Sequence, residues 1–219
     1  MILDKRKRIV AEGYDQVAER YVAWSGKDPI RLHYVDRLIK SVPHGGRILD
    51  IGCGSGDPVA VRLVEHFDVV GVDISATQVA FARRNVPAAR FIESDIMEVR
   101  FPPLEFDAVC AFFSITHLPR EEHAALLGRV NRWLKHGGIF VGSFGVQETS
   151  GAVENDWLGA PMYFSQFDAA ANLALMREAG FEILEEEVRR HDEDGTEVSF
   201  LWLVARKSSA PSEEKRYTG

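Results

Sequence analysis

The sequence is poor in cysteine and has no long apolar run. Its 219 residues include two cysteines, Cys53 and Cys110, too few for a disulfide framework or a Cys/His metal cluster. We therefore expect no bound metal and a reducing, cytoplasmic location. No apolar stretch reaches the about 20 residues that span a bilayer, and residues 1–15 lack the apolar core of a signal peptide. A membrane partner is not expected.

The sequence also lacks an excess of positive charge. Lys and Arg number 26 against 33 Asp and Glu, which gives a net charge of −7. Nucleic-acid binding requires a basic face that neutralises phosphates, so nucleic acid is not an expected partner. Residues 5–8, KRKR, are a basic run that we interpret as the solvated face of a first helical turn.

What the sequence does contain is a regular alternation of strand-like and helix-like segments. Short runs that are apolar on both faces are typical of parallel strands inside a sheet, and they alternate here with segments of helical periodicity. This alternation predicts a parallel sheet with right-handed crossovers. The expected strands are residues 47–52, 68–73, 89–95, 106–115 and 139–144, and the expected helices are residues 5–23, a helix capped by Asp28 and Pro29, 58–66, 76–86 and 120–135, the last ended by Gly137 and Gly138.

The end of the chain departs from this alternation. Residues 181–190 and 196–207 are strand-like and are joined by HDEDG, which carries an Asp-Gly turn signal. A tight turn makes the two strands antiparallel, so we expect a mostly parallel sheet with one antiparallel strand at or near an edge. Residues 208–219 are polar and are expected to be disordered.

A glycine-rich stretch, ILDIGCGSGDP at residues 48–58, ends the first expected strand. Gly52, Gly54 and Gly56 let the backbone turn sharply and approach a ligand, and open parallel sheets bind ligands outside the carboxyl ends of their strands. Dinucleotide sites use G-x-G-x-x-G, but Asp57 takes the place of the last glycine and would repel a pyrophosphate. No Gly-Lys-Ser/Thr follows, which excludes a P-loop. The stretch thus indicates a nucleoside without phosphates, with Asp57 as the N-cap of the next helix.

Two acidic residues support a nucleoside ligand. Asp73 ends the second expected strand, where a carboxylate can accept hydrogen bonds from both ribose hydroxyls. Asp95 ends the third, where it can accept a hydrogen bond from an adenine amino group. Ile74 and Ile96 follow these residues and are expected to sandwich the adenine ring.

Five motifs occur in order along the chain: ILDIGCGSG, VVGVDIS, ESDIM, FDAVCAFFSITHLP and LKHGGIFV. Together they resemble the successive motifs of the class I S-adenosylmethionine-dependent methyltransferases, over roughly residues 45–207. The resemblance implies a Rossmann-like, doubly wound α/β fold with a seven-stranded, mostly parallel sheet, an antiparallel last strand, helices on both faces and an N-terminal helical lid. It implies residues 1–44 as the lid, 45–207 as the methyltransferase core with 145–164 as an acceptor-site loop, and 208–219 as a tail.

The same resemblance implies S-adenosylmethionine as the methyl donor and S-adenosylhomocysteine as the product. Asp50, Gly52, Cys53 and Gly54 would lie along the methionine part of the cofactor, and the backbone near Ala111 would meet its amino group. The resemblance likewise implies that Asp73 binds the ribose and that Asp95 binds the adenine.

Two places near the cofactor are candidates for contact with a methyl acceptor. Tyr14 and Tyr21 lie seven residues apart and hence on one face of the first helix. We expect them to contact the cofactor or the acceptor; the alternative is ordinary packing. His117 follows the fourth strand and can act as a general base because the ordinary pKa of histidine is near neutral. A structural role in the pocket wall is the alternative.

The segment 145–164 is a third candidate. It is long, aromatic and punctuated by Gly and Pro, and a long loop inside a compact domain is usually functional. Trp157, Met162 and Tyr163 offer an apolar wall to an organic acceptor, unless they simply cover the core.

Methyl transfer from S-adenosylmethionine requires few catalytic groups from the protein. Because the methyl group of the donor is already activated, the protein must position a nucleophile and exclude water, and a base is needed only for a hydroxyl or a protonated amine. We predict a small organic acceptor, with oxygen somewhat favoured over nitrogen or carbon. The alternatives are a non-catalytic S-adenosylmethionine-binding regulatory module and a nicotinamide dehydrogenase, which Asp57 and the antiparallel last strand oppose. The sequence leaves the oligomeric state open.

Overall fold

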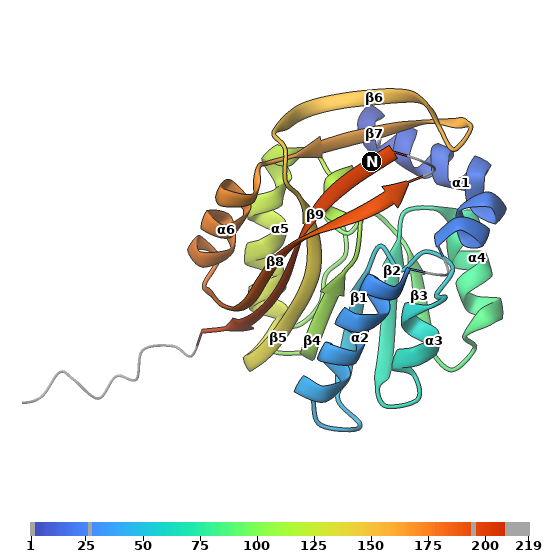
Figure 1. The fold of residues 1–219 in the computed structure, drawn as a ribbon. Coiled ribbons are helices and arrows are strands. Elements are labelled where there is room, and N and C mark those ends of the chain that lie inside the picture. Colours follow the sequence, from blue (N-terminus) through green and yellow to red (C-terminus); the bar gives the residue numbers. More distant parts are fainter. Residues whose placement is uncertain (1–2, 26–27, 194–195, 209–219) are drawn as a thin grey trace, which may run out of the picture.

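A seven-stranded sheet runs through the centre of the structure (Figure 1). The computed structural model describes residues 3–25, 28–193 and 196–208. The strands lie in the order β3-β2-β1-β4-β5-β9-β8. Their bounds are Arg47–Ile51 for β1, Asp68–Asp73 for β2, Arg90–Glu93 for β3, Phe106–Ala111 for β4, Leu134–Gly145 for β5, Phe181–Glu193 for β8 and Thr196–Lys207 for β9.

The pairing of the strands confirms the predicted sheet. β1 pairs in parallel with β2 and β4, as do β2 with β3 and β4 with β5, whereas β9 pairs antiparallel with both β5 and β8. Strand order reverses between β1 and β4, and ligands of this architecture bind in the crevice at such a reversal. The predicted turn at Asp194 and Gly195 and residues 209–219 of the predicted tail lie outside the described residues.

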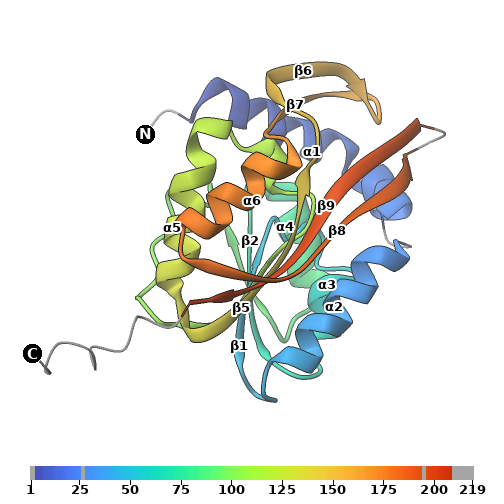
Figure 2. The same cartoon turned by 60° about the vertical axis from the view of Figure 1, so that its left-hand side comes forward.

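Helices cover both faces of the sheet, as predicted (Figure 2). Leu38, Leu63 and Val79, from three helices, pack on one face, and Leu127 and Met176, from two others, pack on the opposite face. Strands buried on both faces need apolar side chains at successive positions, which explains the unbroken apolar runs. The helices are α1 (Lys5–Ser25), α2 (Pro29–Ser41), α3 (Val59–Leu63), α4 (Ala76–Asn85), α5 (His123–Trp133) and α6 (Ala169–Glu178).

Two predicted helix ends are wrong. The N-cap position of α3 is Pro58, with no side-chain cap, so Asp57 stands one residue too early to cap it. The helix predicted to run to residue 135 ends at Trp133, because Leu134 pairs with Phe106 and begins β5. Gly137 has the left-handed φ of +71° expected of it, but it sits within β5 instead of capping a helix.

The prediction of a loop at residues 145–164 is wrong, because most of this segment forms a β-hairpin. Its strands are β6 (Thr149–Trp157) and β7 (Ala160–Gln166), paired antiparallel. Leu158 and Gly159 connect them with φ values of +50° and +92°, the two left-handed residues of a type I′ turn. Leu-Gly is a weak signal for this turn, which is why the sequence pattern does not predict it.

The hairpin and α1 lie together across one end of the sheet (Figure 1). Val10 of α1 packs with Met162 and Tyr163 of β7. A methyl group added to Gly13 would lie 2.6 Å from the carbonyl oxygen of Pro161, so the glycine permits the close approach of helix and strand. The N-terminal helix thus covers the carboxyl ends of the strands through direct packing on the hairpin.

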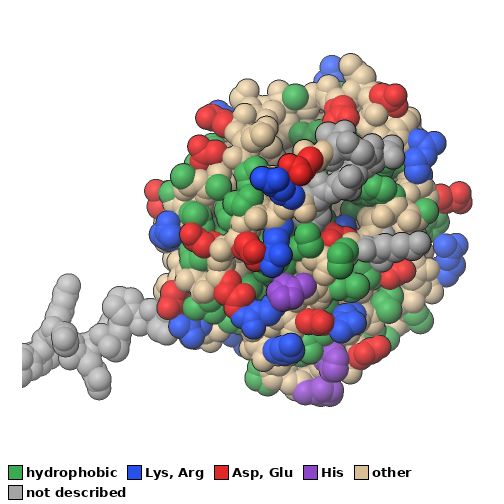
Figure 3. Space-filling view, in the orientation of Figure 1, with side chains coloured by type: hydrophobic (Ala, Val, Ile, Leu, Met, Phe, Trp, Pro, Cys, Tyr) green, Lys and Arg blue, Asp and Glu red, His purple; other side chains and the backbone are tan. Residues whose placement is uncertain are grey.

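Charges of both signs intermingle on the face that α2, β8 and β9 present (Figure 3). Several are ion-paired, as Arg37 is with Glu185 and Arg206 with Glu182. This face therefore does not offer the single-sign surface that phosphate backbones require. Within the described part of the chain, no helix combines the length and the apolar composition needed to cross a bilayer.

Candidate functional site

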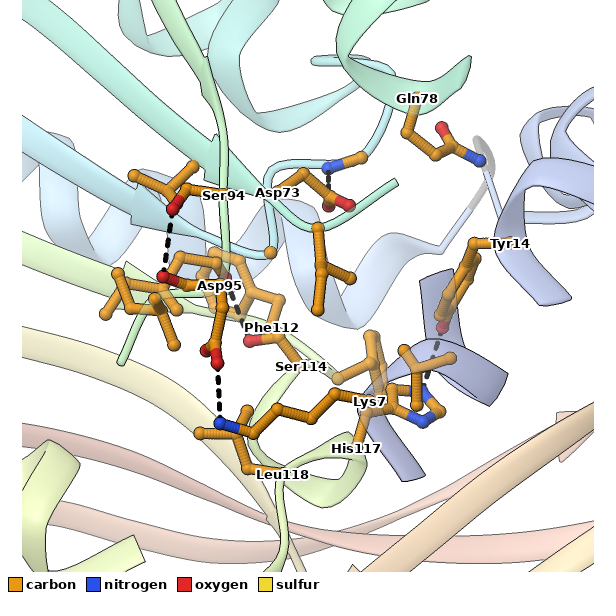
Figure 4. A pocket seen from close by; sticks show the side chains of 18 of the residues that line it. Lys7, Tyr14, Asp73, Gln78, Ser94, Asp95, Phe112, Ser114, His117 and Leu118 are labelled. Carbon is orange, nitrogen blue, oxygen red and sulfur yellow. Dashed lines mark hydrogen bonds and ion pairs between the residues drawn. The ribbon is translucent and has the colours of Figure 1, made fainter. Parts of the chain in front are cut away.

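A narrow cavity of about 80 Å³ opens at the carboxyl ends of the central strands (Figure 4). Gly52 and Gly54 form one wall, with φ values of +70° and +52°. A methyl group on Gly52 would come within 2.3 Å of the Cβ atom of Ser114, so only a bare backbone fits there. The cavity is lined by Lys7, Val10, Tyr14, Tyr21, Ile51, Gly52, Gly54, Val72, Asp73, Ile74, Gln78, Ser94, Asp95, Ile96, Phe112, Phe113, Ser114, His117 and Leu118.

Asp73 ties the glycine turn to the end of β2. One carboxylate oxygen accepts a hydrogen bond from the backbone N–H of Gly54 at 2.8 Å, and the other accepts one from Ser75 at 2.9 Å. Burial raises the pKa of Asp73, and these backbone hydrogen bonds oppose that rise. Each oxygen keeps a further lone pair, so the carboxylate can still accept hydrogen bonds from a ligand in the cavity.

Gln78 lines the first cavity, although the sequence analysis does not predict it as a ligand-binding residue. It lies in the first turn of α4 with 1% of its surface exposed. Neither its amide oxygen nor its amide nitrogen has a hydrogen-bond partner among the described residues, and its side chain borders the cavity (Figure 4). A buried amide without partners is costly, so it marks a place for a polar ligand. A glutamine at helical spacing carries no signal of this in the sequence.

Asp95 forms a buried ion pair with Lys7 of α1 at 2.7 Å (Figure 4). Lys7 also contacts Glu122 at 2.6 Å and is only 5% exposed. Burial lowers the pKa of Lys7, but the hydrogen bonds to both carboxylates outweigh this effect and raise it above its ordinary value. The interpretation of residues 5–8 as a solvated face is therefore wrong for Lys7, which anchors α1 to the end of β3.

His117 joins α1 to the hairpin. Its Nδ1 lies 2.9 Å from the carbonyl oxygen of Tyr163, and its Nε2 lies 2.9 Å from the hydroxyl of Tyr14. Because a carbonyl only accepts, Nδ1 must carry the proton, and Nε2 accepts from the tyrosine. Burial lowers the pKa of His117 to about 4, so the ring is neutral at physiological pH with its Nε2 lone pair directed at Tyr14.

A second cavity, of about 700 Å³, lies between α1, the hairpin and the first residues of β9. Its aromatic side chains form a contiguous group, in which the ring centroids of Tyr14 and Trp157 are 5.4 Å apart and those of Trp24 and Trp157 are 6.4 Å apart. The second cavity adjoins the first, because four residues line both: Tyr14, Tyr21, Phe113 and His117.

Most of the predicted cofactor residues line the first cavity, but three do not. Asp50, Cys53 and Ala111 line neither cavity. Ala111 is fully buried inside the sheet, and Asp50 is 2% exposed and accepts a hydrogen bond from the Cys110 thiol at 3.4 Å. Burial raises the pKa of Asp50 to about 7; the Cys110 hydrogen bond and the charge of Arg31 oppose that rise.

Of the three residues predicted to contact the acceptor, only one lines a cavity. Trp157 lines the second cavity, together with Phe164. Met162 and Tyr163 line neither cavity, because they are buried between α1 and β7. Met162 is 0% exposed and Tyr163 is 3% exposed, and both pack in one cluster with Val10 of α1. The structure therefore does not bring Met162 and Tyr163 to either cavity.

The described residues hold no group of three or more His, Cys, Asp and Glu side chains placed to bind a metal ion. The cavity instead offers a bare glycine backbone, two carboxylates at successive strand ends and an unpartnered amide. These features define a Rossmann-like α/β domain with a site for a nucleoside.

Comparison with known proteins identifies the kind of domain. Residues 48–138 match the family described as methyltransferase domain. The chain is 33% identical over 132 residues to 27-O-demethylrifamycin SV methyltransferase of Amycolatopsis mediterranei, covering 55% of this chain and 47% of that protein. It is 34% identical over 139 residues to demethylmenaquinone methyltransferase of Thermus thermophilus, covering 60% of each. The chain thus spans less than two thirds of the length of these curated relatives.

A solved structure shares the fold. Magnesium protoporphyrin IX methyltransferase from Synechocystis PCC 6803, determined with bound S-adenosylmethionine, superposes with a TM-score of 0.70 at 19% identity, covering 94% of this chain and 99% of that one. Residues 48–138 thus match a methyltransferase-domain family, and the chain has the Rossmann-like fold of this solved methyltransferase.

Proposed function

We propose that this protein transfers a methyl group from S-adenosylmethionine to a small organic molecule, leaving S-adenosylhomocysteine. The observation that carries the proposal is the junction of the two cavities at Tyr14, Tyr21, Phe113 and His117. A nucleoside-type cofactor in the first cavity and an acceptor in the second would face each other there. In-line displacement needs that opposition of donor and nucleophile.

The residues of the first cavity fit the cofactor. Gly52 and Gly54 allow the backbone to approach it, and Asp73 has lone pairs left for the ribose hydroxyls. Asp95 stands at the end of the next strand for the adenine amino group, and Gln78 supplies an amide that lacks partners. The bound cofactor supplies an activated methyl group on a sulfonium.

The second cavity supports an aromatic or quinone-like acceptor. One part of its wall is a group of rings around Trp157: the centroids of Tyr14, Tyr21, Trp24 and Phe164 all lie within 6.4 Å of the Trp157 centroid. Planar ligands stack on such walls at favourable separations. The rings also exclude water from the junction and can stabilise a nearby cation through their π faces. We propose an oxygen atom, rather than nitrogen or carbon, as the atom that accepts the methyl group.

Tyr14 and His117 can remove the proton from a hydroxyl acceptor. The hydroxyl of Tyr14 already donates to Nε2 of His117. On methyl transfer, Tyr14 would take the acceptor proton as its own passes to Nε2, while Nδ1 keeps its hydrogen bond to Tyr163. His117 would then act as a base through Tyr14 instead of touching the acceptor itself.

Binding and turnover together test the proposal. We would titrate the protein calorimetrically with S-adenosylmethionine and S-adenosylhomocysteine, then measure S-adenosylhomocysteine formation with a panel of phenols, hydroquinones, amines and aliphatic alcohols. Binding of both nucleosides and turnover of a phenol or hydroquinone are the expected results. Binding without turnover of any acceptor would favour the non-catalytic regulatory module, and binding of nicotinamide dinucleotide alone would reinstate the dehydrogenase.

A further inference from the structure

An acidic side chain of α1, Asp15, is hydrogen-bonded to the start of α4. One oxygen of its carboxylate accepts from the hydroxyl of Ser75 at 2.6 Å and from the backbone N–H of Thr77 at 2.9 Å. The two helices lie side by side (Figure 1), although Asp15 and Ser75 are 60 residues apart in the chain. Asp15 therefore joins two helices that both border the first cavity.

Asp15 completes the cap of α4 from outside that helix. Ser75 is the N-cap residue, and its Oγ atom accepts from the backbone N–H of Gln78 at 3.1 Å. The first turn of α4 contains no acidic residue of its own, although the free N–H groups and the positive end of a helix favour a carboxylate there. Because Ser75 is fully buried, water cannot readily replace Asp15, and the contact is costly to break.

Ser75 also links Asp15 to the expected ribose site. The backbone N–H of Ser75 donates to the carboxylate of Asp73 at 2.9 Å, and its hydroxyl donates to Asp15. One buried residue thus holds both the carboxylate proposed for the ribose and the N-terminal helix. The contact sets where α1 lies relative to the first cavity.

Three successive residues of α1 contact three different elements. Gly13 packs closely on Pro161 of β7, Tyr14 donates to His117 in the turn after β4 (Figure 4), and Asp15 binds the start of α4. Successive residues of an α-helix point about 100° apart, so these contacts hold the helix from three directions at one level. The position of Tyr14 depends on the contact on either side of it.

We propose that Asp15 is a positioning residue for proton transfer, which holds α1 at the rotation that brings the Tyr14 hydroxyl to Nε2 of His117. The inference rests on the proposed function, which assigns the acceptor proton to Tyr14 and His117. Asp15 lines neither cavity, so it acts through Tyr14 and not on the substrate. The ion pairs of Lys7, about 12 Å earlier along the helix axis, keep α1 docked when Asp15 is replaced.

Nitrogen NMR of protein labelled with ¹⁵N in histidine tests the position of Tyr14 without an acceptor. The resonance of the unprotonated Nε2 of His117 shifts when this atom accepts a hydrogen bond, and Tyr14→Phe shows where it lies without one. In Asp15→Ala the resonance should move most of the way to its position in Tyr14→Phe. In Asp15→Asn it should stay near the wild-type position, because the amide oxygen can accept both hydrogen bonds.

Two further variants complete the set. Glu19→Ala is the matched control, because it removes one negative charge from the exposed surface of the same helix, and it should leave the resonance unchanged. Asp15→Glu keeps the charge but carries the oxygens one methylene farther from the helix. It should shift the resonance part of the way, and it serves if Asp15→Ala does not fold.

Turnover provides the second measurement. With a phenolic acceptor, kcat of Asp15→Ala should fall by about tenfold, because the reacting groups are displaced, whereas its calorimetric affinity for S-adenosylhomocysteine should change far less. Asp15→Asn should recover most of kcat. A purely structural role would lower the unfolding temperature of Asp15→Ala but leave the resonance and kcat at their wild-type values.

A wild-type His117 resonance in folded Asp15→Ala and Asp15→Glu would overturn the inference, whatever the stability of the two variants. Failure of the wild-type protein to bind S-adenosylhomocysteine or to methylate any acceptor would instead overturn the proposed function. In that case the resonance alone decides whether Asp15 positions Tyr14.

Discussion

Tyr14 and His117 are 103 residues apart in the chain, yet the tyrosine hydroxyl lies 2.9 Å from the histidine Nε2. The contact joins the N-terminal helix to the turn after β4 at the point where the two cavities meet. It also decides what the histidine can do. Both ring nitrogens are engaged and the ring is buried, so the proposed route from a substrate proton to His117 runs through Tyr14.

Tyr14→Phe tests this relay with the smallest possible change. With a phenolic acceptor we expect kcat to fall by about 10²-fold, since general base catalysis is typically worth that much or more. Affinity for S-adenosylhomocysteine should stay within about threefold, because the ring remains in place. Steady-state kinetics at saturating acceptor provide kcat, and calorimetry provides the affinity. A kcat within twofold of wild type would reduce His117 and Tyr14 to wall residues. Tyr21→Phe, in the same aromatic group, is the control.

Asp73→Asn should weaken the binding of S-adenosylhomocysteine by roughly 1–3 kcal/mol, the cost of leaving hydrogen-bonding groups unpaired. An amide accepts through its oxygen only, so asparagine loses the backbone hydrogen bond of either Gly54 or Ser75 and offers the ribose one accepting atom instead of two. Calorimetry measures the change. Asp36→Asn, in a surface ion pair with Arg62, should bind like wild type. Equal affinity in folded Asp73→Asn would remove the ribose assignment.

Lys7→Met should destabilise the protein by about 3 kcal/mol, because it leaves the largely buried carboxylate of Asp95 and the partly exposed one of Glu122 without their cation. The N-terminal helix should also become sensitive to protease before the rest of the chain. Urea unfolding and limited proteolysis report the two effects. Lys5→Met, two residues earlier and exposed, should change stability by less than about 0.5 kcal/mol. If both variants behave alike, the buried ion pairs do not anchor α1.

Gly52→Ala and Gly128→Ala should change stability in opposite directions. The new methyl group at position 52 would meet Ser114 at 2.3 Å on a backbone with φ of +70°, a strain of about 1–3 kcal/mol that should also abolish cofactor binding. Gly128 lies within α5 with nothing within 4 Å of an added methyl group, so alanine should stabilise that helix by about 0.5–1 kcal/mol. Thermal unfolding and calorimetry measure both, and a neutral Gly52→Ala would contradict the close backbone approach.

Two buried groups make opposite contributions to the pH dependence of stability. Burial lowers the pKa of His117 from 6.5 to about 4, so the unfolded state binds more protons in that range and the His117 contribution to stability falls as the pH falls. Burial raises the pKa of Asp50 from 3.8 to about 7, so the folded state binds more protons and the Asp50 contribution falls as the pH rises. Between pH 4.5 and 6.5 the two slopes should largely cancel in wild type.

Asp50→Asn removes one of the two slopes. Its unfolding free energy should rise from pH 4.5 to 6.5 relative to wild type, by about 1–3 kcal/mol. Urea unfolding at several pH values measures the difference, and Asp36→Asn is again the surface control. A difference between Asp50→Asn and wild type that does not vary with pH would show that Asp50 does not titrate in this window.

The sequence by itself determined the parallel sheet, its antiparallel addition, the glycine turn and the two strand-end carboxylates. These features depend on local rules: strand and helix periodicity, turn chemistry, and the fact that parallel strands bring their carboxyl ends to one edge. Gly52, Gly54, Asp73 and Asp95 therefore meet around one cavity, as their positions after successive strands indicate.

The tertiary structure alone decided which other side chains reach the cavities. Lys7 and Asp95 are 88 residues apart, and no periodicity records that a basic helical turn will be buried against a carboxylate. Trp157 lines the second cavity beside the turn of the hairpin, whereas Met162, two residues beyond its cross-strand partner Ala160, packs against Val10 of α1. Gln78 stands out only because it is buried and neither atom of its amide group has a hydrogen-bond partner among the described residues. Such contacts follow from the packing of distant elements, which local sequence does not encode.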